Sequence, residues 1–157
     1  MASNRVTVTV AHTVHVKRTP EDVFDYTQDY STRSDWDPAV TDSQVLSEQP
    51  RRVRATIGGV GSAVVEYKLF RRGERTSAAF VEIESRIVTG GGGSWSYARR
   101  DGGTDWTQSN TIELRPGLVG RLMVPLVRWS LARSTRNSMA KAKEIMEANA
   151  PAAPIGG

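Results

Sequence analysis

The sequence contains no cysteine, which excludes disulfide cross-links and thiolate chemistry. It has only two histidines, and the motifs of zinc enzymes, serine nucleophiles and phosphate-binding loops are absent from it. No uncharged stretch reaches the roughly 18 residues that a membrane-spanning helix needs, and the first residues contain no apolar signal segment. These absences predict a soluble, cytoplasmic protein that carries no metal and no cofactor.

Length and composition indicate one domain. A chain of 157 residues is long enough for a single core, and we expect the domain to cover residues 1–149 and a disordered tail to follow at 150–157. Fourteen glycines and 38% hydrophobic residues fit a turn-rich β protein better than a helix bundle. The net charge of +4 favours an ordinary solvated surface over a binding site for an anionic partner.

Hydrophobic periodicity divides the first two thirds of the chain into strands and short helices. Residues 5–17 alternate strictly, with valines and His12 on one face, and predict a long half-buried strand. Thr19-Pro20 begins a short helix, and a second one covers residues 31–36. A period of two then predicts six more strands, at residues 42–48, 51–58, 63–71, 78–87, 93–100 and 104–114, with a mobile glycine turn at 90–93.

The last third of the chain predicts one long helix over residues 116–148. Leu118, Leu122, Leu126 and Trp129 recur on one helical face, and we expect this stripe to pack against the sheet. Pro125 lacks a backbone N–H group and should bend the helix.

This order of elements resembles the START-like, birch-pollen-allergen-like superfamily, in its polyketide cyclase/dehydrase and lipid-transport (SRPBCC) branch. The resemblance is carried by TPEDVFDYTQDYSTRSDWDP at residues 19–38, GGT at 102–104 and LVGRLMVPLVRWSLARSTRNSMAKAKEIME at 118–147. It implies an α+β helix-grip fold, in which a curved seven-stranded antiparallel sheet wraps around the C-terminal helix and two short helices follow the first strand. An apolar cavity is implied between sheet and helix. The resemblance specifies the fold better than the function.

Two amides lie on the predicted inner face of the last strand. If residues 102–103 form the hairpin turn, Trp95 and Tyr97 lie opposite Asn110 and Gln108 on that face. Burying an unpaired amide costs about 1–3 kcal/mol. Gln108 and Asn110 therefore either bond to each other, to backbone or to water, or they orient a polar group on an otherwise apolar ligand. We expect the cavity to be lined by His12, Trp36, Tyr67, Trp95, Tyr97, Trp106, Gln108, Asn110, Leu122 and Leu126.

Two functions fit such a cavity. The first is binding, and by extension transport, of a small hydrophobic ligand such as a lipid or polyketide. The alternative is a polyketide cyclase, aromatase or dehydratase, in which Tyr97, Gln108, Asn110 or His12 would steer proton transfer. The resemblance implies a cavity arginine and a cavity tyrosine for such enzymes. The sequence places no arginine on an inward face, and Arg133 on the long helix is the nearest candidate. This departure from the family weakens the enzyme hypothesis and leaves the catalytic residues unknown.

A third function is docking on a membrane surface through the apolar residues 118–129 together with Arg121 and Arg128. It ranks last, because the same stripe is needed to fill the space between helix and sheet.

Arginines gather at alternate turns of the predicted meander. Turns near residues 50, 73 and 101 share one end of the sheet, whereas the turns near 59 and 91 lie at the other end, where the resemblance places the cavity mouth. The arginines either keep strand ends soluble or contact an acidic partner or an anionic membrane. Nucleic acid is not expected, because no aromatic side chains are interleaved with them. The residues concerned are Arg51, Arg52, Arg71, Arg72, Arg75, Arg99 and Arg100.

Overall fold

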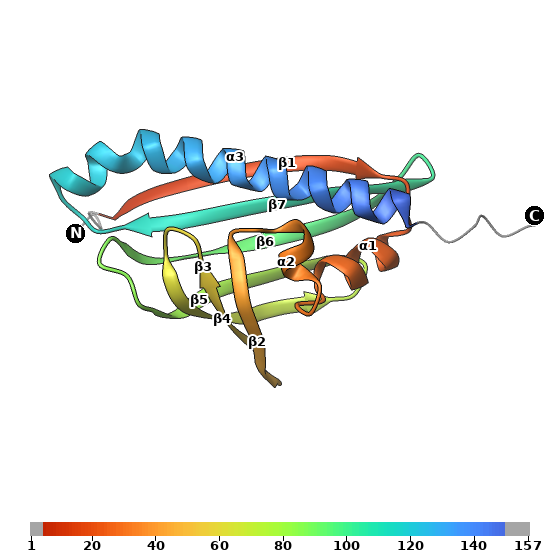
Figure 1. Ribbon diagram of the computed structural model, residues 1–157, viewed down its shortest axis with the longest axis horizontal. Helices are drawn as coiled ribbons and strands as arrows, with labels where there is room; N and C mark the ends of the chain where they lie inside the picture. The colour runs from red at the N-terminus through yellow and green to blue at the C-terminus, as the bar shows by residue number, and fades with distance from the viewer. Residues whose placement is uncertain (1–4, 150–157) are drawn as a thin grey trace, which may run out of the picture.

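The computed structural model describes residues 5–149, in which a seven-stranded antiparallel sheet curves beneath a long C-terminal helix (Figure 1). This architecture confirms the predicted helix-grip fold. The predicted tail at 150–157 lies outside the described residues. In chain order the elements are β1 (Val6–Val16), α1 (Pro20–Thr27), α2 (Arg33–Trp36), β2 (Val40–Glu48), β3 (Arg51–Ile57), β4 (Gly61–Arg71), β5 (Arg75–Ile83), β6 (Val88–Arg100), β7 (Gly103–Leu114) and α3 (Leu118–Ala148).

The sheet is a meander closed by its first strand, in the order β1-β7-β6-β5-β4-β3-β2. Arg100 pairs with Gly103, so the β6–β7 turn consists of Asp101 and Gly102, whose φ angles of 46° and 76° suit a tight hairpin. The predicted turn lay one residue later. In the structure Trp95 therefore pairs with Gln108, two residues away from the predicted partner. A shift of two residues keeps every side chain on its face, so the predicted inner face is correct.

The glycine run lies inside β6 and not in a turn, which corrects the prediction for residues 90–93. The chain reverses earlier, at residues 84–87. A side chain at Gly92 would collide with the carbonyl oxygen of Ala78 on β5, and one at Gly91, where φ is 134°, would collide with that of Thr111 on β7. Glycine is required here because neighbouring backbones approach too closely for a Cβ atom. The cavity mouth expected at this end of the sheet stays a prediction.

We expect Gly92→Ala to lower the free energy of unfolding by about 1–3 kcal/mol, because its methyl group meets backbone atoms held in the β5 ladder. Urea unfolding followed by tryptophan fluorescence measures this loss. Gly58→Ala is the matched control, since a Cβ atom there meets Ala39 at an ordinary 3.7 Å. Equal losses in the two variants would contradict the steric argument.

Helix α3 packs with the face opposite to the one predicted. Leu118, Leu122, Leu126 and Trp129 are 73%, 71%, 62% and 59% exposed, so the predicted inward stripe is wrong. The fully buried residues on the sheet-facing side are small or flexible, and the partly buried Val124, Val127 and Ile145 pack beside them against the core. The helix lies close along β1, as Figure 1 shows. The buried residues of α3 are Gly120, Thr135, Ser138, Met139, Ala142 and Met146.

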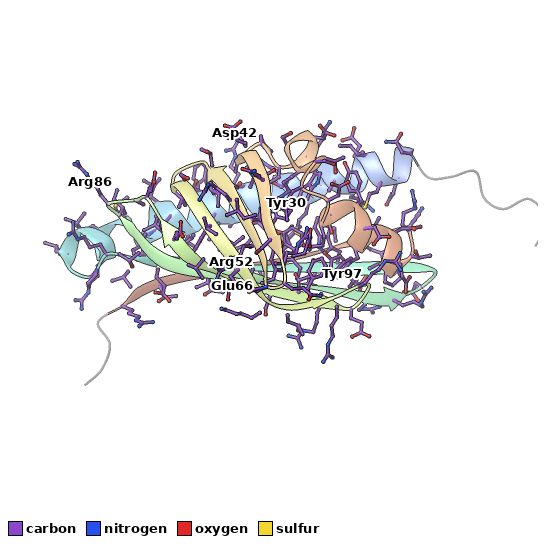
Figure 2. The ribbon with its side chains drawn as sticks, turned by 90° about the horizontal axis from the view of Figure 1, so that it is seen from below. Tyr30, Asp42, Arg52, Glu66, Arg86 and Tyr97 are labelled. Atoms are coloured by element: carbon purple, nitrogen blue, oxygen red, sulfur yellow. The ribbon has the colours of Figure 1, made fainter. Side chains whose placement is uncertain are left out.

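The arginine-bearing turns lie at one end of the sheet, as the meander predicts. Several of these arginines pair with acids of the same region. Arg52 Nη2 lies 2.7 Å from Oε2 of Glu66 on the neighbouring strand (Figure 2). Arg72 Nη2 lies 2.6 Å from Asp25 Oδ2. Arg51 pairs with Glu48, with 2.9 Å between Nη1 and Oε2, and its guanidinium also lies 4.7 Å from the ring centroid of Phe70. This end therefore presents fewer free cations than the count of arginines suggests.

Candidate ligand-binding cavity

A cavity of about 190 Å³ lies between the inner face of the sheet and the middle of α3. Its floor includes Gly92 and Gly93 of β6, and Gly93, which pairs with Asn110, has no side chain to fill the space above the strand. The cavity touches both parts of the core, an aromatic cluster that contains Trp95 and an aliphatic cluster that contains Ala63. Its apolar wall consists of Ala39, Val40, Val53, Ala55, Ile57, Ala63, Val65, Ala78, Phe80, Ile112 and Leu131.

Of the ten residues predicted to line the cavity, the structure brings together Tyr67, Trp95, Gln108 and Asn110. They come from β4, β6 and β7, and alternation along these strands turns all four toward α3. Whether they contact a ligand stays a prediction.

Six predicted residues lie elsewhere. Trp36, Tyr97 and Trp106 are buried in the aromatic cluster, where Trp36 and Trp106 pack against Trp95 at centroid distances of 6.1 and 5.8 Å. They support the cavity wall from behind. His12 is half-buried on β1, outside the cavity lining. The predictions for Leu122 and Leu126 are wrong, because both project from the exposed face of α3.

The two amides form part of a polar strip across the cavity. Asn110 Nδ2 donates to Gln108 Oε1 at 3.3 Å and to Thr135 Oγ1 of α3 at 3.0 Å. Gln108 is only 4% exposed, and its Nε2 atom has no hydrogen-bond partner in the described part of the chain. The amides thus bond to each other, as one of the two alternatives predicts, and they still leave one buried donor unpaired.

The cavity also contains a buried arginine that the sequence did not predict. The guanidinium of Arg33 lies 4.4 Å from the ring centroid of Trp36 and 4.5 Å from that of Trp95, a double cation–π arrangement. Its Nε atom donates to Asp37 Oδ2 at 3.0 Å, while Ser138 of α3 donates to Asp37 Oδ1 at 3.2 Å. This ion pair therefore fixes α2 beneath α3.

A local signal for Arg33 exists in the sequence. Arg33, Trp36 and Asp37 are spaced i, i+3 and i+4, so one helical turn brings them to the same side. Arg133, the nearest candidate for a cavity arginine in the sequence, lies on the outer side of α3, with its guanidinium 5.3 Å from the ring centroid of Trp129.

A chain of hydroxyl and amide groups extends from the cavity into the core. Tyr30 and Tyr67 share a hydrogen bond of 2.7 Å, Tyr67 donates to Gln28 Oε1 at 3.0 Å, and Gln28 Nε2 donates to the Tyr97 oxygen at 2.8 Å. Figure 2 shows Tyr30 and Tyr97, and the Tyr97 oxygen shares a further hydrogen bond of 2.8 Å with Thr27 Oγ1. Burial raises the pKa of Tyr67 and of Tyr97 well above the ordinary tyrosine value. Both phenols therefore stay neutral near pH 7 and serve as hydrogen-bonding groups.

A curved sheet, a long covering helix and an internal cavity with a few polar groups define a helix-grip protein. The profile of the family "Polyketide cyclase / dehydrase and lipid transport" matches residues 7–147. The chain belongs to this family. A comparison with curated proteins finds no match.

Solved structures show the same fold at low sequence identity. The Zhui aromatase/cyclase from Streptomyces sp. R1128 is 18% identical, with a TM-score of 0.78 over 95% of this chain and 99% of that chain. The protein TTHA0849 from Thermus thermophilus is 17% identical, with a TM-score of 0.75 over 93% of this chain and 100% of that chain. A START superfamily protein from Mycobacterium smegmatis is 17% identical, with a TM-score of 0.68 over 91% of this chain and 99% of that chain.

Proposed function

We propose that the cavity binds a small, mainly apolar ligand, such as a compact lipid or polyketide, that carries at least one hydrogen-bond acceptor. The observation that carries this proposal is the buried Gln108 Nε2 donor, which has no partner among residues 5–149. An unpaired buried donor costs about 1–3 kcal/mol, and a ligand acceptor would offset that cost. The apolar wall would hold the rest of the ligand.

The size of the cavity restricts the ligand. Its volume of about 190 Å³ lies below the roughly 300–1,000 Å³ that is usual for sites of drug-sized ligands. We therefore propose a ligand of about the size of one substituted ring, and native mass spectrometry of the purified protein would reveal a co-purified one.

A pair of isosteric probes tests the role of Gln108. Acetophenone carries a carbonyl acceptor, and α-methylstyrene has the same shape with a methylene group in its place. Titration calorimetry measures the dissociation constants of both probes. In Gln108→Met we expect acetophenone to lose about five- to tenfold in affinity relative to α-methylstyrene, since one hydrogen bond contributes about 1 kcal/mol. The proposal is contradicted if the wild type binds neither probe, or if the ratio of the two dissociation constants is unchanged in the variant.

Stability in the absence of ligand provides an independent measurement on the same variant. Gln108→Met removes an unpaired buried donor and keeps the side-chain volume, but it also removes the Oε1 acceptor of Asn110 Nδ2, which keeps Thr135 Oγ1 as a partner. Because these two effects oppose each other, its free energy of unfolding should stay within about 1 kcal/mol of the wild type. Gln44→Met, an exposed position on β2, is the matched control and should alter neither stability nor the probe ratio.

An enzyme of the aromatase/cyclase kind is the second candidate, and the buried Arg33 favours it. The sequence pattern placed no arginine on the inner face of a strand, whereas the structure places the Arg33–Asp37 pair at the cavity wall. Three of the similar solved structures carry the name aromatase/cyclase or ARO/CYC. The small cavity weighs against a long polyketide chain. Turnover of a poly-β-ketone thioester by the wild type, absent in Arg33→Lys, would favour the enzyme over a binding protein.

A further inference from the structure

The outer face of α3 exposes a continuous apolar stripe. Leu118, Leu122, Leu126 and Trp129 are all more than half exposed, and Val119 beside them is 70% exposed. Eleven residues separate the first from the last member, so the stripe is about 17 Å long at 1.5 Å per residue. Single exposed apolar side chains are ordinary, but a contiguous row of this kind marks an interaction surface.

Arginines surround this stripe without acidic neighbours on the helix. Helical geometry of about 100° per residue places Arg121 and Arg128 along one flank, while Arg133 and Arg136 continue the exposed face toward the C-terminus. The sequence contains no aspartate or glutamate from residue 114 to 143. Within residues 5–149 none of these four arginines forms a salt bridge, in contrast to Arg72, which pairs with Asp25.

We propose that this face of α3 docks on the surface of an anionic lipid bilayer. The leucines and Trp129 would enter the boundary between headgroups and acyl chains, and the arginines would extend to lipid phosphates. In the part of the chain that the structure describes, no helix is apolar enough to cross a bilayer, so the contact is peripheral. This surface lies on the opposite side of α3 from the cavity-lining Thr135 and Ser138, so docking goes beyond the ligand-binding proposal.

Charge distinguishes a lipid surface from a second copy of the chain. A symmetric dimer through this stripe would bring eight arginines, four from each copy, to one interface with no acids on either helix segment to neutralise them. The same arginines gain energy on an anionic bilayer, at about 1 kcal/mol for each one near the surface. The large side chains of the stripe are also exposed, as insertion into a fluid interface requires.

Vesicle sedimentation tests the proposal. We expect the full chain to bind vesicles of 70% phosphatidylcholine and 30% phosphatidylglycerol, and Leu122→Ser/Leu126→Ser to weaken binding at least about tenfold, since two half-inserted leucines are lost. Val81→Ser/Ile87→Ser is the matched control, because these side chains are 45% and 41% exposed outside α3, and it should change binding less than about twofold.

Trp129 supplies a direct optical readout. It is 59% exposed, whereas Trp36, Trp95 and Trp106 are all at most 9% exposed. Vesicles should therefore shift the emission of the wild type to the blue and protect it from iodide, and Trp129→Phe should show neither effect.

The arginines are tested by charge and salt. Arg121→Gln/Arg128→Gln should lose affinity for the anionic vesicles severalfold, as should the wild type between 50 and 500 mM NaCl. The proposal is overturned if anionic vesicles are not bound at low salt, or if the leucine and control variants lose affinity equally. It is also overturned if Trp129 is shielded by concentration-dependent self-association without lipid. The affinity of the Leu122→Ser/Leu126→Ser variant for acetophenone tests ligand binding in the cavity independently of vesicle binding.

Discussion

Replacing Arg33 with methionine is expected to lower the free energy of unfolding by about 3–5 kcal/mol. The guanidinium lies between the rings of Trp36 and Trp95 and donates to Asp37, and both charged residues are 8% exposed. Its removal leaves the Asp37 carboxylate buried with Ser138 as its remaining side-chain donor. Urea unfolding followed by circular dichroism measures the loss without relying on the tryptophans that Arg33 contacts.

Two further variants separate the buried charge from lost packing. Arg33→Met/Asp37→Asn should recover part of the loss, because no unpaired charge then stays buried. Arg72→Met breaks a short pair with Asp25 whose side chains are 61% and 51% exposed, and should cost far less stability than Arg33→Met because solvent screens the pair. If the Arg33 and Arg72 variants lose equal stability, burial is not the cause.

Trp106→Ala is expected to cost about 3–5 kcal/mol of unfolding free energy. Trp106 is fully buried and packs edge-on against Trp36 and Trp95 at centroid distances of 5.7 and 5.8 Å. These contacts hold the rear of the cavity wall, so the loss of the indole leaves a void that the sheet and α2 cannot close. Chemical unfolding of the variant measures the effect.

Trp129→Ala is the matched substitution on the other side of the molecule. Because Trp129 is 59% exposed, we expect its free energy of unfolding to stay within about 0.5 kcal/mol of the wild type. A cost for Trp129→Ala comparable with that of Trp106→Ala would restore the original expectation that the stripe of α3 faces inward.

Local patterns predicted most of the fold. Alternation over residues 5–17 gave β1, and the start of α1 followed from Thr19, whose hydroxyl oxygen accepts from the Asp22 N–H at 3.2 Å. The inner face of β7 was correct despite a shifted turn, because pairing errors of two residues leave the faces unchanged. Four residues of the candidate site followed from this face and from β4 and β6.

The face of α3 was beyond local patterns. Apolar residues recur at helical spacing on two sides of α3. Leu122 and Leu126 belong to one side, whereas Met139 and Met146 belong to the side that faces the sheet. Periodicity along the helix favours the larger side chains as the inward face. The face that turns inward depends on how closely the helix approaches the sheet. Its main contacts are with β1, whose residues lie more than 100 positions before α3 in the chain.

The sequence by itself determined the order of strands and helices, the alternation of their faces and the gathering of arginines at one end, because each depends on neighbouring residues. Only the tertiary structure decided the burial of Arg33, which needs Trp95 and Ser138 from a distant strand and helix. It also decided that Gly92 lies against another strand and that the stripe of α3 faces outward. These outcomes depend on how closely two backbones approach, a quantity that no single segment encodes.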